Sequence, residues 1–403
     1  MSLNETPSGE RLHIGFFGRR NAGKSSLVNA ITGQDLAVVS ETKGTTTDPV
    51  RKAMELLPIG PVLIVDTPGF DDEGNLGALR VRKTQQELNR TDVAVLVVDA
   101  SEGMKTADRQ LLAMFQAKQL PYLIVWNKSD LLSTIPAPAE HEIWVSATEK
   151  KNIWECKELL ARLGSASMTE RPLVAYLLQP LDTVILVIPI DKAAPKGRLI
   201  LPQQQVLRDI LDCGAIPIST RNTELSETLE KLSSPPKLVI TDSQVFDQVD
   251  AILPPEIPLT SFSILMARHK GLLDAAVQGV RAVDHLQDGD VVLISEGCTH
   301  HRQCDDIGTV KLPRWLQQCS GKDFSIETSS GRDFPEDLSR YALIVHCGGC
   351  MLNEREIRYR MQCAQDQNVP ITNYGIFIAH FRGILDRSIQ MLPGYEEGTI
   401  CAT

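Results

Sequence analysis

The sequence lacks any apolar run that approaches the ~18 residues a helix needs to span a bilayer. The stretch from Met1 to Leu12 is polar and contains no apolar core of the kind found in a secretory signal. We therefore expect a cytoplasmic protein without a membrane partner.

Basic residues are in the minority, with 41 lysines and arginines against 51 aspartates and glutamates and a net charge of −10. Because a broad nucleic-acid-binding surface needs an excess of positive charge, this balance argues against nucleic acid as a partner.

Cysteines are also sparse for a disulfide framework. Nine in 403 residues are more typical of metal ligation together with ordinary buried thiols.

Near its N-terminus the sequence contains a phosphate-binding loop. The apolar run from His13 to Phe17 predicts a strand, and an apolar-periodic helix is predicted to follow the loop. Backbone N–H groups at the start of that helix can bind a phosphate, the Lys24 side chain can reach the β- and γ-phosphates, and the Ser25 hydroxyl can bind Mg²⁺. The nucleotide-binding residues predicted here are Asn21, Ala22, Gly23, Lys24, Ser25 and Ser26.

Three further strand ends carry the rest of a nucleotide site. Asp66 is placed to hold the Mg²⁺ shell, and Gly69 can offer its backbone N–H to a γ-phosphate. Asp130 can accept two hydrogen bonds from the guanine N1–H and 2-amino group, which adenine does not present, so this motif selects GTP over ATP. The base-binding residues predicted from these strand ends are Asn127, Lys128, Asp130, Ser146 and Ala147.

Together these motifs resemble those of Ras-like GTPases, specifically the bacterial TrmE and Era branch. The run Gly44-Thr45-Thr46-Thr47-Asp48 is similar to switch I of that branch, which makes Thr46 the expected Mg²⁺ ligand, with Thr45 or Thr47 as alternatives. The resemblance implies a GTP hydrolase that produces GDP and phosphate. The catalytic residues it implies are Lys24, Thr46, Asp66 and Gly69.

Two residues bear on the rate of hydrolysis. Phe70 stands where a Ras-type enzyme carries the glutamine that orients the attacking water, and a phenylalanine cannot do this. In the branch that the chain resembles, a P-loop asparagine such as Asn21 helps to hold a K⁺ ion that supplies positive charge. We therefore expect slow basal hydrolysis that K⁺ stimulates.

Beyond residue 166 strand-like and helical runs alternate, which predicts two small α/β domains with mostly parallel sheets. The middle one carries no cluster of chemically active residues, so association as a homodimer is its expected role. Within the last one, the chain is predicted to be helical from Ala267 to Val283. The expected α/β domains are 1–166 for GTP binding, 167–262 for dimerisation and 263–403 for metal binding.

A metal site is predicted where two strand-like runs of the last domain end. One run leads into His346-Cys347-Gly348-Gly349-Cys350, and the other leads into Cys298 and His300. Because parallel strands end at the same edge of a sheet, Cys298 can meet Cys347 and Cys350. From the residues alone, structural zinc and an iron–sulfur cluster have similar weight, and a redox dithiol would leave Cys298 unexplained.

The order of these motifs behind the GTPase resembles, over essentially the whole chain, the HydF family of FeFe-hydrogenase maturation GTPases. The resemblance implies that Cys298, Cys347 and Cys350 bind a 4Fe-4S cluster, with His300 or His346 as a candidate fourth ligand. It also implies a scaffold that transfers a di-iron precursor to apo-hydrogenase and works with the radical-SAM-type maturation enzymes.

The alternative is a ribosome- or tRNA-associated GTPase of the TrmE/Era kind with a structural metal site. Two other histidines, His285 and His380, lie in helical or loop patterns. They are expected to be packed or solvated.

Overall fold

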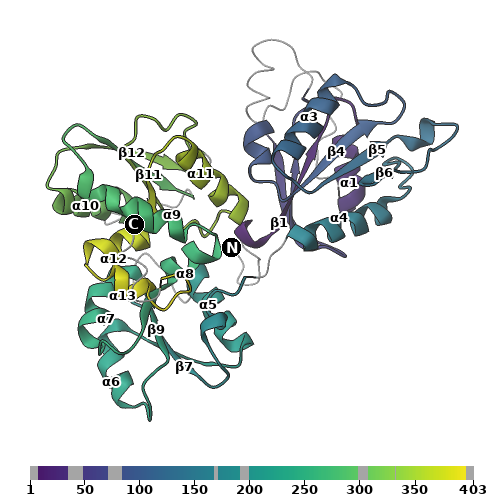
Figure 1. Cartoon of the computed structure of the whole chain (residues 1–403). Coiled ribbons are helices and arrows are strands. Elements are labelled where there is room, and N and C mark those ends of the chain that lie inside the picture. The colour runs from purple at the N-terminus through teal and green to yellow at the C-terminus, as the bar shows by residue number, and fades with distance from the viewer. Residues whose placement is uncertain are drawn as a thin grey trace. The chain divides into compact units, whose positions relative to one another are not determined.

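The computed structural model describes residues 8–34, 49–70, 84–167, 171–190, 199–297, 307–331 and 333–395. Contacts divide the chain into two compact units, Met1–Glu170 and Arg171–Thr403, and each combines parallel strands with helices (Figure 1). Within the described residues, no helix is long and apolar enough to cross a membrane.

The first unit is built on a six-stranded sheet with the order β2-β3-β1-β4-β5-β6. Only β2 and β3 pair antiparallel; the other neighbours are parallel. The strands are β1 (Leu12–Phe17), β2 (Val50–Leu56), β3 (Gly60–Asp66), β4 (Val93–Asp99), β5 (Tyr122–Asn127) and β6 (Glu142–Trp144).

Helices cover both faces of this sheet because its central strands are apolar on both sides. Along β1, Phe16 packs in one core cluster with α1 (Lys24–Thr32) and α4 (Ile153–Ser167), whereas Phe17 packs in the other with α3 (Thr106–Ala117). The central strands are therefore held rigidly, and the loops at their carboxyl ends share one edge of the sheet.

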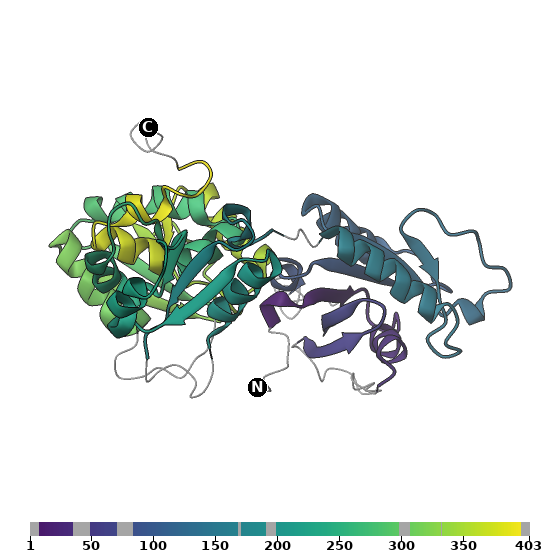
Figure 2. The same ribbon diagram turned by 90° about the horizontal axis from the view of Figure 1, so that it is seen from below.

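The second unit contains two four-stranded sheets, both fully parallel (Figures 1 and 2). Their orders are β10-β9-β7-β8 and β12-β11-β13-β14. The predicted fold class, a Ras-like α/β domain followed by two small mostly parallel sheets, is confirmed. The strands are β7 (Thr183–Val187), β8 (Ile216–Thr220), β9 (Leu238–Thr241), β10 (Leu259–Ser261), β11 (Val291–Glu296), β12 (Ser325–Ser330), β13 (Leu343–His346) and β14 (Ile371–Asn373).

The helices of this unit follow the strands and share one large core cluster. In chain order they are α5 (Leu201–Asp212), α6 (Leu225–Glu230), α7 (Phe246–Ile252), α8 (Phe262–His269), α9 (Leu273–Val280), α10 (Leu312–Ser320), α11 (Glu354–Asp366), α12 (Tyr374–Phe381) and α13 (Leu385–Ile389). The single helical run predicted from Ala267 to Val283 is wrong, because α8 ends before Gly271, whose φ of 73° is left-handed, and α9 begins after it.

The two sheets have the same topology. Numbered in chain order within each sheet, the strands are arranged fourth, third, first and second in both. The strand and helix pairs β10–α8 and β14–α12 are also alike in sequence and in helix capping. The side chains of Ser261 and Asn373 each accept a hydrogen bond from the backbone N–H three residues later. Identical residues occur at Thr260 and Thr372, Ile264 and Ile376, Ala267 and Ala379, Gly271 and Gly383, Leu273 and Leu385, Asp274 and Asp386, and Gln278 and Gln390.

Each sheet and its helices therefore form one of two repeats, the first containing β7 to β10 and the second β11 to β14. Corresponding residues of the two repeats also meet each other. Ser263 on α8 corresponds to Gly375 on α12, and a methyl group added to Gly375 would overlap the Ser263 hydroxyl. Lys270, after α8, donates hydrogen bonds into the loop before α11, while its counterpart Arg382, after α12, pairs with Asp247 at the start of α7. The second unit is therefore a pair of repeats related by an approximate two-fold axis near Ser263 and Gly375.

We predict that Gly375→Ala lowers the free energy of unfolding by about 1–3 kcal/mol, because the new methyl group meets the Ser263 side chain. Gly348→Ala is the matched control, since a methyl group there meets nothing within 4 Å. Urea unfolding followed by circular dichroism measures both. The exchanged double variant Ser263→Gly/Gly375→Ser should recover part of the loss, and equal losses for Gly375→Ala and Gly348→Ala would contradict the close approach.

Candidate functional site

The phosphate-binding loop joins β1 to α1 in a compact turn. Asn21 and Gly23 both have left-handed backbones, with φ of 61° and 85°. Lys24 is 7% exposed, and its ammonium group donates hydrogen bonds to the carbonyl oxygens of Gly18 at 3.0 Å and Arg19 at 2.7 Å. The lysine is thus folded over the loop whose backbone N–H groups would bind a phosphate.

Ser25 and Asp66 meet beside this loop. The Ser25 hydroxyl donates to one Asp66 carboxylate oxygen at 2.6 Å, and the other oxygen is buried and has no hydrogen-bond partner among the described residues. Burial raises the pKa of Asp66, although Ser25 and Lys24 act in the opposite direction. A buried carboxylate with an unpaired oxygen next to a hydroxyl is a donor set that fits Mg²⁺.

The base-binding residues converge through Asn127. Its side-chain amide donates to the Ala22 carbonyl at 3.2 Å, and its side-chain oxygen accepts from the Ala147 backbone N–H at 3.1 Å. This one residue ties the end of β5 to the phosphate-binding loop and to the loop after β6. Ser146 is buried, whereas Asn21, Ser26 and Asp130 are exposed.

Lys128 lies beside this loop and forms an ion pair with Asp99, with 2.5 Å between Nζ and Oδ2. Burial acts to raise the pKa of Asp99, but the hydrogen bonds from Lys128 and Ser101 outweigh it, and the pKa is lowered. The lysine is thereby held against the end of β4.

Gly69 and Phe70 approach the phosphate-binding loop from β3. A methyl group on Gly69 would lie 2.8 Å from the Arg20 backbone nitrogen, so only glycine fits. The Phe70 ring packs against the core cluster around α3, and its backbone N–H donates to the Gly18 carbonyl at 3.3 Å. Phe70 therefore presents no polar group to a nucleotide.

One contact of the loop was not foreseen from the sequence. Arg19 pairs with the fully buried Asp108 at 2.8 Å and with Glu102 at 2.9 Å. It ties the loop to the start of α3. No local pattern could reveal it, because Arg19 and Asp108 are 89 residues apart in the sequence.

Of the predicted cluster ligands, the structure describes Cys347, Cys350 and His346, whereas Cys298 and His300 lie outside the described residues. The predicted Mg²⁺ ligand Thr46 also lies outside them. Both described cysteines are free thiols. Cys347 Sγ accepts backbone N–H groups from Gly297 at 3.0 Å and Gly349 at 3.3 Å. The end of β11 therefore lies against the end of β13, as the parallel arrangement predicts.

Burial dominates the protonation of these thiols. It raises the pKa of Cys347, where the two backbone N–H groups act in the opposite direction, and it raises the pKa of Cys350, where nearby Lys270 opposes it. Backbone N–H groups directed at a cysteine sulfur are typical of iron–sulfur sites, since they stabilise the thiolate. The described half of the site fits such a cluster.

His346 is 1% exposed, and both of its ring nitrogens have protein partners. Nδ1 lies 2.6 Å from the Cys347 carbonyl oxygen, to which it must donate, and Nε2 accepts from Arg360 at 3.2 Å. Burial, followed by the charge of Arg360, lowers the pKa of His346 to about 3. The imidazole is thus neutral, and a metal bond would require it to give up one of these hydrogen bonds.

Two buried cations support the loop from Cys347 to Cys350, which we call the cysteine loop. Neither cation was foreseen from the sequence. Lys270 donates to the carbonyl oxygens of Gly349 at 2.5 Å and Leu352 at 2.8 Å. Arg360 is 1% exposed and binds Glu356, one turn earlier on α11, as well as His346 and the Gly331 carbonyl. In the sequence these residues look like an ordinary charged helix face.

Three stretches of the chain match known protein families. Residues 274–391 match the hydrogen maturase F tetramerization domain, and residues 173–271 match the hydrogen maturase F dimerization domain. Residues 13–128 match a family described as 50S ribosome-binding GTPase.

The curated relatives align with only part of the chain. The tRNA modification GTPase MnmE of Thiobacillus denitrificans is 34% identical over 145 residues, which are 36% of this chain and 32% of that protein. MnmE of Herminiimonas arsenicoxydans is 38% identical over 145 residues, 34% of this chain and 31% of that protein. The chain spans about a third of the length of these relatives.

Among solved structures, Era of Aquifex aeolicus is similar with a TM-score of 0.35 and 19% sequence identity. The alignment covers 52% of this chain and 92% of that chain.

We predict that Arg360→Leu lowers the free energy of unfolding by about 3–5 kcal/mol, because it removes the buried ion pair between Arg360 and the Glu356 carboxylate. Arg358→Leu is the matched control on the same helix. Arg358 is half-exposed where it pairs with Glu354, so its loss should stay below about 1 kcal/mol. Urea unfolding distinguishes the two variants, and equal losses would show that the buried network does not stabilise the loop region.

Proposed function

The chain belongs to the hydrogen maturase F family, and from this we propose that it is a GTP-hydrolysing scaffold that holds a 4Fe-4S cluster and passes a di-iron precursor to apo-hydrogenase. The observation that carries the proposal is the contact between Gly297 and Cys347 Sγ, because Gly297 directly precedes Cys298. That contact supports a meeting of the two predicted halves of the cluster site, because it joins the ends of β11 and β13 in a chain that also carries a GTPase domain.

GTP and Mg²⁺ are the ligands of the GTPase domain. Ser25 and Thr46 would ligate Mg²⁺, with Asp66 next to Ser25, and the ion would neutralise charge on the β- and γ-phosphates. Lys24 would exchange its two carbonyl partners for phosphate oxygens, and the Gly69 N–H would bind the γ-phosphate. The close approach of Gly69 to Arg20 supports that role, since it places the Gly69 backbone beside the phosphate-binding loop.

The rate of hydrolysis follows from what lies around the γ-phosphate. Phe70 packs against the core cluster around α3, and its side chain has no polar group that could orient the attacking water. Asn21 is exposed at the tip of the loop, where its side chain could share a K⁺ ion with the nucleotide. Hydrolysis would be slow in the absence of K⁺.

We predict that kcat is at least about tenfold higher in KCl than in NaCl at equal ionic strength, since the ion adds positive charge at the phosphates. Asn21→Ala should abolish the difference, whereas Asn29→Ala on α1, outside the nucleotide site, should retain it. Phosphate release at saturating GTP gives the rates. The same kcat in both salts, or a K⁺ effect that survives Asn21→Ala, would rule out this role.

For the cluster, Cys298, Cys347 and Cys350 would be the thiolate ligands. His346 is better placed to hold the loop than to ligate, because its two ring nitrogens already bind Cys347 and Arg360. Of the two histidine candidates, His300 is therefore the preferred fourth ligand. When bound, a cluster with three thiolates and one weaker ligand leaves an iron able to accept an incoming group.

Oligomerisation is part of the family's architecture, as the dimerization and tetramerization domains indicate. We place the homodimer interface at the free edge of β8. Three large apolar side chains are exposed around the turn that leads into this strand, those of Leu181, Leu211 and Ile216. The proposed partners are apo-hydrogenase and the radical-SAM-type maturation enzymes. The proposed location is the cytoplasm, which suits the free thiols of the described cysteines.

A ribosome- or tRNA-associated GTPase is the alternative, and the MnmE relatives are the observation that favours it. Those relatives match only about a third of the chain. The alternative therefore leaves the two hydrogen maturase F domains without a role, and we prefer the scaffold.

We predict that protein purified and reconstituted under anaerobic conditions holds about four iron and four sulfide ions per chain, and shows an EPR signal after reduction. Cys298→Ala should lose most of this iron, because one of three thiolates is gone. Cys363→Ala, a half-buried thiol on α11, is the matched control and should keep it. Zinc as the only metal, without iron uptake, would overturn the cluster assignment and leave a structural site.

A further inference from the structure

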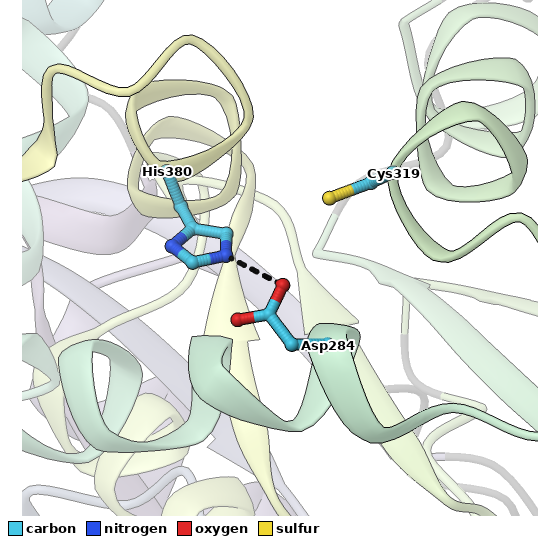
Figure 3. A group of neighbouring side chains, drawn as sticks. All are labelled: Asp284, Cys319 and His380. Atoms are coloured by element: carbon cyan, nitrogen blue, oxygen red, sulfur yellow. Dashed lines mark hydrogen bonds and ion pairs between the residues drawn. The ribbon is translucent and has the colours of Figure 1, made fainter.

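A second group of ligand-type side chains lies in the second unit. Asp284, Cys319 and His380 each contribute one ligand atom, and these atoms all lie within 4.8 Å of one another. His380 Nε2 and Asp284 Oδ1 are 3.2 Å apart, and Figure 3 shows the Cys319 thiol pointing toward this pair from a neighbouring helix.

The group lies at the opposite edge of the sheet from the cysteine loop. Cys319 and His380 are in the last turns of α10 and α12, and Asp284 is in the short helix Arg281–His285 that precedes β11. Helices that follow parallel strands run back to the amino ends of the strands, whereas Cys347 follows the carboxyl end of β13. The two groups are therefore separate sites.

We propose that Asp284, Cys319 and His380 form a binding site for a divalent transition-metal ion of the Zn²⁺ type. A tetrahedral ion with bonds of about 2.0–2.1 Å to nitrogen and oxygen sets these two ligand atoms about 3.3 Å apart, which is the spacing of the histidine–aspartate pair. The thiol would sit about 3.6 Å from the nitrogen. Since its present separation is at most 4.8 Å, it has to approach by about 1.2 Å at most.

The donor set selects the kind of ion. One thiolate, one imidazole and one carboxylate suit zinc and its neighbours in the periodic table, whereas Mg²⁺ and Ca²⁺ prefer oxygen ligands alone. Asp284 is about half exposed, so water can reach the site and complete the coordination. The ion would tie the ends of three helical segments together.

The backbone around the site also favours a cation. The last carbonyl groups of a helix lack partners within the helix and carry partial negative charge. Two helices, α10 and α12, end beside the three ligands. A positive ion there is stabilised by both helix ends as well as by the side chains.

The first repeat indicates that the fold itself does not require these residues. His380 corresponds to Arg268 on α8, and the helix of Asp284, which precedes β11, corresponds to the short helix Ala175–Leu177, which precedes β7. There Arg268 lies over the Tyr176 ring, with its guanidinium carbon 4.0 Å from the ring centre. The same structural position is thus occupied by a cation in one repeat and by metal-ligand side chains in the other.

The test is a Co²⁺ titration of the full chain in which Cys298, Cys347 and Cys350 are replaced by serine, so that the thiolates of the proposed cluster site cannot bind the ion. We expect one Co²⁺ per chain, with a near-ultraviolet thiolate-to-cobalt band and visible bands of tetrahedral intensity. Cys319→Ser should remove the thiolate band, and His380→Gln should weaken binding at least tenfold. Cys363→Ser is the matched control and should change neither.

Thermal unfolding with and without Zn²⁺ is the second readout. Zn²⁺ should raise the Tm of the parent and of Cys363→Ser, but not that of folded His380→Gln. The proposal is overturned if the parent binds no Co²⁺, or if the thiolate band persists in Cys319→Ser. If Cys319→Ser does not fold, His380→Gln decides, and unchanged Co²⁺ affinity in that variant overturns the proposal.

Discussion

The residues of the nucleotide site and of the cysteine loop depend on one constraint, which is that parallel strands end at the same edge of a sheet. In the first unit this edge holds the phosphate-binding loop after β1, Asp66 at the end of β3 and Asn127 at the end of β5. In the second unit it holds Gly297 after β11 and Cys347 after β13, with a backbone N–H of one directed at the sulfur of the other. Residues far apart in the sequence become neighbours because the buried strands leave their loops only this edge on which to meet.

Buried charges then fix the cysteine loop in place. Lys270 of the first repeat donates hydrogen bonds to two carbonyl oxygens in and just after this loop. Arg360 on α11 donates a hydrogen bond to His346. Burying such groups is costly unless their hydrogen bonds are satisfied, and here each one has several partners. The protein's own hydrogen bonds therefore hold the loop that carries Cys347 and Cys350.

The sequence predicted the parts of the molecule whose signals are contiguous. The phosphate-binding loop, the strand that delivers Asn127 and the strand that leads into His346 could all be read because motif and element adjoin. What remained hidden depends on contacts between distant segments: Arg19 with Asp108 across 89 residues, and Lys270 with Gly349 across 79. The break at Gly271 was missed for another reason, since the apolar periodicity continues on both sides and only the left-handed backbone separates α8 from α9. We propose the division into three domains; the matches to the dimerization and tetramerization domains adjoin between residues 271 and 274.

Comparing the two repeats distinguishes residues that the fold needs from residues that could serve a function. Residues common to both repeats, such as Thr260 and Thr372 or Gly271 and Gly383, lie in strands, at helix ends and in the core, where they maintain the architecture. Where the two repeats carry different residues at corresponding positions, the fold accepts both. At such positions function, and not folding, can determine which residue is present. The loop after β9 contains Asp242 and Ser243 but no cysteine, whereas the loop after β13 contains two, and Arg268 faces Tyr176 where His380 faces Asp284. At both positions the side chains of metal-ligand type occur in the second repeat, whereas association is named for both repeats by the dimerization and tetramerization domains that they match. Association therefore does not explain these differences, since it is common to the two repeats.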